Sequence, residues 1–197
     1  LMALDLASGR LSRLTAHVPW DITGMALSED GRWIVAQANV DGRDELRVLD
    51  AASFREVSAP PVPPGGIGRM EFHRGTGRMA YALNSPKGPN QLFVLDPASG
   101  RSEQWTRAQA APGVDPATFS DQQVVRWKSF DGLTISGIVT RPPARFTGRR
   151  PVIIDIHGGP ESQAQMAFQG RWNYFVQELG ITMIEPNVRG SSGYGKT

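Results

Sequence analysis

The first hundred residues alternate short apolar stretches with glycine-containing polar turns, a pattern that predicts strands rather than helices. Three of the apolar stretches end in a leucine-aspartate step, and a polar turn follows each step. The three steps are Leu4-Asp5, Leu49-Asp50 and Leu95-Asp96. They lie 45 and then 46 residues apart, which predicts an internal repeat whose copies each contribute the same strand.

The segments between these steps also match one another. When the two copies are aligned, Met25 and Met70 occupy the same position, and a similar polar turn follows each of these methionines. A repeat of about 40–45 residues built from short strands is typical of the four-stranded blades of a β-propeller. We therefore predict that residues 1–118 are propeller blades with a linker, and that residues 32–37 and 78–83 form equivalent strands of neighbouring blades.

The remainder of the chain has a different pattern. The β-branched run at residues 152–156 predicts a strand that is buried on both faces. Apolar residues then recur at helical spacing over residues 172–179, Gly180 stands where a helix commonly ends, and a second apolar run begins at Ile181. Strand, helix and strand in this order predict a βαβ unit, in which the strands at 153–156 and 182–184 run parallel.

A histidine, two glycines and a proline, residues 157–160, follow the first of these strands. Consecutive glycines are common in tight turns and do not identify a site alone. This turn, however, lies at the carboxyl end of a predicted parallel strand, where open α/β sheets build their binding sites. Glycine leaves the backbone N–H groups free to face a ligand, so the turn is a candidate functional loop.

Three segments in this order resemble the opening of a known catalytic domain. They are VVRWKSFDGLTISGIVTRPP at 124–143, with Asp131-Gly132 as a two-residue hairpin turn, IDIHGGPESQ at 154–163 and EPNVRGSSGYG at 185–195. Together they resemble the start of the α/β-hydrolase domain in the prolyl oligopeptidase family of serine peptidases, and most of all its acylaminoacyl-peptidase and dipeptidyl-peptidase-like branches. A propeller followed by such a domain is the architecture of that family.

The resemblance implies a multidomain fold: the last blades of a β-propeller in residues 1–118, then the N-terminal part of an α/β-hydrolase domain in residues 119–197. In α/β-hydrolases the catalytic serine lies in a Gly-x-Ser-x-Gly motif, and the acid and the histidine come later. The sequence has no such motif, because Tyr194 stands where GSSGYG would need its second glycine. We therefore expect the triad beyond residue 197 and predict that this chain is an inactive fragment.

The resemblance also implies roles for residues that are present. The backbone N–H of Gly159 is expected to bind the oxyanion, with Gly158 shaping the loop and Pro160 stiffening its exit. His157 is expected to support this loop through a side-chain hydrogen bond. Arg189 either fixes its own loop by pairing with a carboxylate or reaches a substrate carbonyl, and Tyr194 is a weaker candidate for lining the cleft.

Composition excludes some partners and cofactors. With 21 Lys and Arg against 19 Asp and Glu, the net charge of +2 gives no strong field for nucleic acid or a membrane surface. No apolar stretch is long enough for a membrane span. The chain has no cysteine, and we expect no metal or other cofactor. The compartment stays undetermined, with the cytoplasm slightly favoured, and a homo-oligomer remains open.

Three functions remain under consideration. The first is a serine peptidase that acts on short peptides, whether as an aminopeptidase, an acylaminoacyl peptidase or an oligopeptidase. The second is a carboxylesterase of the α/β-hydrolase fold, which would not account for the propeller repeat. The third is a non-catalytic propeller module that binds a protein or peptide and carries a degenerate hydrolase domain.

Overall fold

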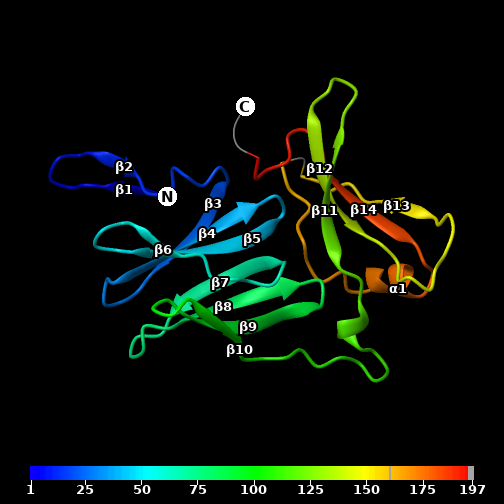
Figure 1. Ribbon diagram of the computed structural model, residues 1–197, viewed down its shortest axis with the longest axis horizontal. Coiled ribbons are helices and arrows are strands. Elements are labelled where there is room, and N and C mark those ends of the chain that lie inside the picture. The colour runs from blue at the N-terminus through cyan, green and yellow to red at the C-terminus, as the bar shows by residue number, and fades with distance from the viewer. Residues whose placement is uncertain (160, 195–197) are drawn as a thin grey trace.

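The computed structural model describes residues 1–159 and 161–194, and Pro160 and residues 195–197 lie outside the described part. Within that part, a two-stranded hairpin of β1 (Met2–Leu4) and β2 (Leu11–Arg13) precedes three four-stranded sheets. Two of these sheets are antiparallel and lie together on one side of the molecule, and the third lies on the other side (Figure 1).

Each antiparallel sheet is a meander in which every strand pairs with its sequence neighbour. The first consists of β3 (Asp21–Leu27), β4 (Trp33–Val40), β5 (Arg43–Asp50) and β6 (Glu56–Ser58). The second consists of β7 (Gly66–Phe72), β8 (Met79–Ser85), β9 (Gly88–Asp96) and β10 (Arg101–Gln104). The predicted equivalence of residues 32–37 and 78–83 is confirmed, because β4 and β8 are each the second strand of their sheet.

The same polar turn follows each leucine-aspartate step. The carboxylate of Asp50 accepts hydrogen bonds from the backbone N–H of Ser53 at 2.8 Å and from its hydroxyl at 2.6 Å. Asp5 and Asp96 bond Ser8 and Ser99 in the same way through the hydroxyl. In all three turns the serine hydroxyl is the main cause that lowers the pKa of the aspartate. This local chemistry explains why the repeat is visible in the sequence.

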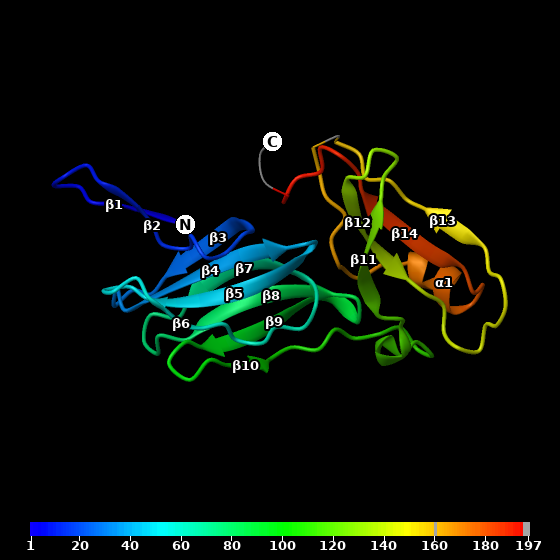
Figure 2. The same cartoon turned by 45° about the horizontal axis from the view of Figure 1, so that its top comes forward.

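The core of this half lies between the two antiparallel sheets, which are stacked in both views (Figure 2). It is formed by eight buried side chains: Val35, Leu46, Val48, Ile67, Met79, Tyr81, Leu83 and Leu95. A buried carboxylate, Asp44, also joins the sheets by accepting bonds from Gln37 Nε2 at 2.9 Å and from the backbone N–H of Ile67 at 2.6 Å. Each sheet thus covers the apolar face of the other.

The third sheet is mixed, with the order β11-β12-β14-β13. Its members are β11 (Gln122–Lys128), β12 (Thr134–Thr140), β13 (Val152–Ile154) and β14 (Thr182–Asn187), and a short 3₁₀ turn, η1 (Pro116–Thr118), precedes them. β11, β12 and β14 pair antiparallel, whereas β13 and β14 pair parallel and are direct neighbours. The helix α1 (Trp172–Gln177) lies beside β14 in both views. The predicted parallel pair is therefore confirmed.

Two details of this region differ from the prediction. The strand β13 ends at Ile154 and is not buried on both faces, since Val152 is 52% and Ile154 62% exposed. It is an edge strand that pairs only with β14 among the described residues. The hairpin between β11 and β12 has a loop longer than two residues, closed by a bond from Ser129 N–H to Leu133 C=O at 2.8 Å.

In the described part of the chain, no helix is both long and apolar enough to cross a membrane. The same residues contain no cluster of three or more histidine and acidic side chains that could hold a metal ion. His17 pairs with a carboxylate of β6, since its Nε2 lies 2.7 Å from Glu56 Oε2.

Candidate active site

The parallel pairing of β13 and β14 brings the loops that follow them to the same edge of the mixed sheet. We call residues 155–159 the glycine loop and residues 188–194 the serine loop. The Nε2 atom of His157 lies 2.7 Å from the hydroxyl of Ser191 and joins the two loops. A backbone bond from Ser192 N–H to Ser162 C=O at 2.8 Å ties the serine loop to the chain just after the glycine loop. The serine loop thus braces the glycine loop from one side.

The backbone of the glycine loop requires glycine at its tip. Gly159 has a φ of +136°, which residues with a side chain rarely adopt. A Cβ at this position would also lie 3.1 Å from the backbone nitrogen of Glu161. Both Gly158 and Gly159 are exposed, and no acceptor among the described residues takes a hydrogen bond from the Gly159 N–H. Gly159 is therefore an exposed residue whose N–H has no hydrogen-bond partner in the described part of the chain.

Arg189 is held at the start of the serine loop. Its guanidinium forms an ion pair with Asp131 and donates to the Ser129 hydroxyl at 3.1 Å. The guanidinium also lies over the ring of Phe130, 5.0 Å from its centroid. The hydrogen bond from Arg189 is the main cause that lowers the pKa of Asp131. Arg189 therefore ties the serine loop to the hairpin between β11 and β12.

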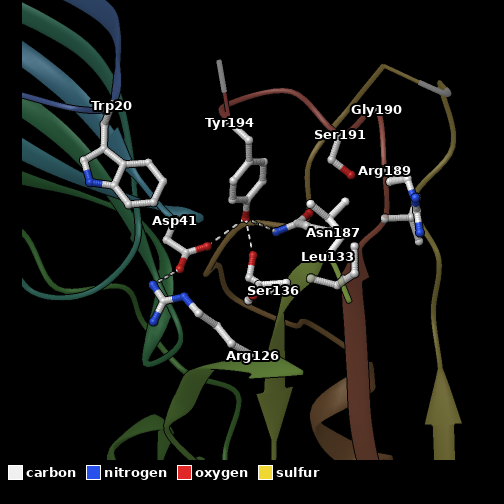
Figure 3. A pocket seen from close by; sticks show the side chains of 13 residues that line it. Trp20, Asp41, Arg126, Leu133, Ser136, Asn187, Arg189, Gly190, Ser191 and Tyr194 are labelled. Atoms are coloured by element: carbon white, nitrogen blue, oxygen red, sulfur yellow. Dashed lines mark hydrogen bonds and ion pairs between the residues drawn. The ribbon is translucent and has the colours of Figure 1, made fainter. Parts of the chain in front are cut away.

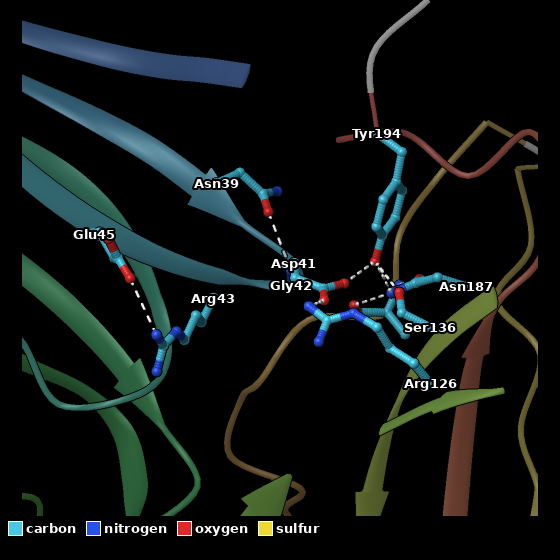
Figure 4. A network of polar contacts seen from close by, with 10 residues as sticks. Asn39, Asp41, Gly42, Arg43, Glu45, Arg126, Ser136, Asn187 and Tyr194 are labelled. Atoms are coloured by element: carbon cyan, nitrogen blue, oxygen red, sulfur yellow. Dashed lines mark hydrogen bonds and ion pairs between the residues drawn. The ribbon is translucent and has the colours of Figure 1, made fainter. Parts of the chain in front are cut away.

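The hydroxyl of Tyr194 links the mixed sheet to the first antiparallel sheet (Figure 4). It donates its proton to Asp41 Oδ1 at 2.8 Å. Because a phenol has only one proton, its contacts with Ser136 Oγ at 2.7 Å and Asn187 Nδ2 at 2.8 Å are bonds that it accepts. The other carboxylate oxygen of Asp41 pairs with Arg126 of β11. We call these five residues the Tyr194 hub.

The hub depends on an aspartate in a turn. Asp41 and Gly42 connect β4 to β5 as a two-residue turn with φ values of +55° and +85°. The Asp41 side chain is only 4% exposed, which is unusual for a carboxylate in a hairpin turn. Burial raises the pKa of the Tyr194 hydroxyl, which keeps it protonated as the donor to this carboxylate. The sequence signalled only a hairpin turn at this position.

The chain between the glycine loop and α1 contacts both halves of the molecule. The backbone N–H of Met166 donates to Gly42 C=O at 2.7 Å, and that of Phe168 donates to Asn84 Oδ1 at 2.8 Å. On the other side, Asn187 Oδ1 accepts a bond from the backbone N–H of Ala164 at 2.7 Å. Residues 163–168 therefore lie between the antiparallel sheets and the mixed sheet and fasten them together.

A cavity of about 450 Å³ lies beside the hub, between the first antiparallel sheet and the mixed sheet (Figure 3). Trp20 and Asp41 line it from one side, and the strands and loops of the mixed sheet line it from the other. Both Arg189 and Tyr194, which were singled out from the sequence, contribute to its wall. His157, Gly158 and Gly159 are not among its lining residues, so the cavity and the glycine loop are separate features of the same edge.

A partly buried carboxyl group lies on β14 near the glycine loop. Glu185 accepts a hydrogen bond from Gln169 Nε2 at 2.9 Å. Burial, and then the like charge of Asp155, raise the pKa of Glu185 from 4.5 to about 7. Asp155 itself follows β13 and forms a backbone bond from its N–H to Ile184 C=O at 2.9 Å, so the two acidic residues meet across the parallel pair.

This geometry predicts a pH-dependent stability. Between about pH 4.5 and 7 the unfolded chain loses the Glu185 proton while the folded chain keeps it. The free energy of unfolding should therefore fall as pH rises through this interval, by on the order of 2 kcal/mol, and then stay level. Urea unfolding at pH 5 and pH 8 would measure the change. Glu185→Gln should abolish the difference in unfolding free energy between the two pH values, whereas Glu29→Gln, at an exposed site, should leave the difference unchanged. An unchanged pH dependence in Glu185→Gln would contradict this assignment.

No family model matches the chain. Among curated proteins, it is 24% identical over 205 residues to dipeptidyl aminopeptidase BIII of Pseudoxanthomonas mexicana, an alignment that covers 100% of this chain and 29% of that protein. It is 25% identical over 201 residues to the probable dipeptidyl-peptidase 5 of Emericella nidulans, covering 97% of this chain and 27% of that protein. The chain thus spans less than a third of the length of these relatives.

Solved structures of peptidases have the same fold over almost the whole chain. A puromycin hydrolase superposes with a TM-score of 0.80 at 25% identity, covering 98% of this chain and 30% of that one. Prolyl oligopeptidase B from Galerina marginata superposes with a TM-score of 0.81 at 18% identity, covering 99% and 28%. The relatives and structural neighbours of this chain are therefore peptidases of the prolyl oligopeptidase family.

Proposed function

We propose that this chain belongs to a serine peptidase of the prolyl oligopeptidase family that hydrolyses short peptides by acyl transfer. The observation that carries the proposal is the glycine loop: it follows a parallel strand at its carboxyl end, its exposed Gly159 has a positive φ, and the neighbouring loop braces it. The peptidase activity named for the relatives supports the reaction class. Acyl transfer needs N–H donors, because negative charge develops on the carbonyl oxygen in the transition state.

In this proposal residues 1–118 are blades of a β-propeller with a linker, and residues 119–197 are the first part of an α/β-hydrolase domain. The two antiparallel meanders support the first assignment. An antiparallel hairpin followed by a parallel strand pair with an intervening helix supports the second. The substrate would enter between the two parts, and short peptides are the class that a propeller-covered site admits.

The chemistry follows from these positions. A serine oxygen would bond to the peptide carbonyl carbon while a histidine takes its proton, and the same histidine would protonate the amine as the C–N bond breaks. The N–H of Gly159 would stabilise the oxyanion together with the N–H after the serine. Gly158 would shape the loop, and His157 would hold it through Ser191. Pro160, proposed to stiffen the loop, lies outside the described residues.

Ser191 and His157 form a hydrogen-bonded pair that has to be distinguished from a nucleophile and its base. Ser191 is only 8% exposed, and the Nδ1 atom of His157 lies 3.2 Å from the Gly158 carbonyl oxygen rather than a carboxylate. In a catalytic triad a carboxylate on the histidine holds the ring and stabilises it once it has taken the proton, and this pair has no such carboxylate among the described residues. The pair is therefore assigned a structural role in bracing the glycine loop.

A serine-directed fluorophosphonate probe tests the proposal. We expect no labelling of the 197-residue chain, and we expect labelling of a single serine, outside these residues, in the longer protein that contains it. Peptide mapping by mass spectrometry would locate the label. Labelling at Ser191 would instead make the pair with His157 catalytic, and failure of the longer protein to label would support a non-catalytic propeller module. Hydrolysis of esters but not of peptides by the labelled protein would favour a carboxylesterase.

A further inference from the structure

The cavity beside the Tyr194 hub has apolar walls that come from three separate elements (Figure 3). Trp20 precedes β3, Leu133 directly precedes β12 and Ile135 is its second residue, and Val188 follows β14. Leu133 and Val188 are 48% and 38% exposed, so these side chains offer apolar surface that the described residues do not cover. Apolar walls that converge on one hollow are typical of a binding pocket rather than of scattered surface residues.

Four polar side chains of the Tyr194 hub line the cavity and use hydrogen bonds on one another or on Arg126. The Tyr194 hydroxyl uses its one proton on Asp41 and accepts from Ser136 and Asn187. Both oxygens of Asp41 are occupied, by Tyr194 and Arg126. A neutral polar side chain entering here would lose its water without gaining partners from these groups, whereas an apolar one has no such bonds to lose.

Two arginines lie at the cavity and each is paired with a carboxylate. Arg126 pairs with Asp41 and Arg189 with Asp131, which leaves little net charge at the cavity. Their side chains are 57% and 44% exposed, and a guanidinium has five N–H donors. These donors suit a backbone carbonyl oxygen next to the bound side chain.

From these observations we propose that the cavity is a subsite for an apolar side chain of a peptide, with Trp20 and Leu133 determining the preference. The choice of a peptide as ligand rests on the proposed function, since the serine loop that lines the cavity also braces the glycine loop through Ser191 and His157. The subsite uses residues of both the first antiparallel sheet and the mixed sheet, so neither half contains it alone.

Binding of blocked tripeptides tests the subsite without requiring catalysis. The probes are N-acetyl-Gly-Leu-Gly-amide and N-acetyl-Gly-Asn-Gly-amide, whose central side chains are nearly equal in size but differ in polarity. In NMR titrations of the chain, the leucine peptide should shift the indole N–H signal of Trp20 and the methyl signals of Leu133. The asparagine peptide should bind about tenfold more weakly. Equal binding of the two peptides, or tighter binding of the asparagine peptide, would overturn the proposal.

A pair of variants matched in exposure provides the control. Leu133 is 48% and Leu92 47% exposed, but only Leu133 lines the cavity. Leu133→Ser should weaken binding of the leucine peptide about tenfold, and Leu92→Ser should leave it unchanged. The Leu133 backbone N–H and C=O, which close the hairpin loop, are retained in the variant. A loss of the same size in both variants would show that the cavity has no special role.

Hydrolysis by the longer protein separates this inference from the proposed function. If peptides are hydrolysed and the leucine preference in kcat/KM is lost in Leu133→Ser, both proposals stand. If peptides are hydrolysed with the same preference in the variant and in the wild type, the subsite is wrong and the peptidase stands. If nothing is hydrolysed but the leucine peptide still binds selectively, the subsite stands and the peptidase is wrong.

Discussion

Gly159→Pro is expected to lower kcat/KM for peptide hydrolysis by the longer protein at least about 100-fold. Proline has no N–H, so the variant lacks the proposed donor to the oxyanion. Its ring also holds φ near −65°, whereas Gly159 has a φ of +136°, so the loop itself would be displaced. Initial rates with a peptide nitroanilide, together with fluorophosphonate labelling to count active serines, would measure the loss.

Gly148→Pro is the matched control for this substitution. Gly148 also has a positive φ, +74°, and lies in the exposed connection between β12 and β13, with nothing near its Cβ position. Proline fits the left-handed backbone there equally poorly, but Gly148 precedes β13 whereas the glycine loop follows it, and Gly148 is assigned no role at the site. We expect its kcat/KM to stay within about twofold of wild type. Equal losses in the two folded variants would refute the role of Gly159.

Asp41→Asn is expected to lower the free energy of unfolding by about 2–3 kcal/mol. Asparagine keeps the shape of the side chain and can still accept from Tyr194, but its amide places N–H donors against the guanidinium of Arg126. Arg126 is half exposed and can turn to water, which keeps the loss below that of a fully buried ion pair. Urea unfolding at pH 7 measures the loss, and hydrogen exchange in residues 188–194 should accelerate.

A double-mutant cycle tests whether Asp41 acts through the hub. Tyr194→Phe removes the hydroxyl that bonds Asp41, Ser136 and Asn187, so the loss in the double variant should be smaller than the sum of the single losses. Asp131→Asn breaks an exposed pair and should cost less than about 1 kcal/mol. Strict additivity of Asp41→Asn and Tyr194→Phe would contradict a shared hub.

The strands and their order within each antiparallel sheet could be predicted because they depend on interactions between sequence neighbours. Each strand of the meanders pairs with the next, and the turn after each leucine-aspartate step is built from residues three positions apart. The parallel pair of β13 and β14 was also predictable, because a short helical crossover leaves few other arrangements. The exposure of the β13 side chains could not be predicted, because it depends on which other elements pack against the strand.

The Tyr194 hub and the cavity beside it could not be derived in this way. Asp41 and Tyr194 are 153 positions apart, and the sequence around Asp41 shows only a hairpin turn. Their contact arises because residues 163–168 fasten the antiparallel sheets to the mixed sheet, which brings the turn after β4 against β12 and β14. Local pattern and turn chemistry therefore determined the elements, the repeat and the glycine loop. Only tertiary packing decided which distant polar groups meet at the interface, because a buried carboxylate must find its partners wherever the folded chain provides them.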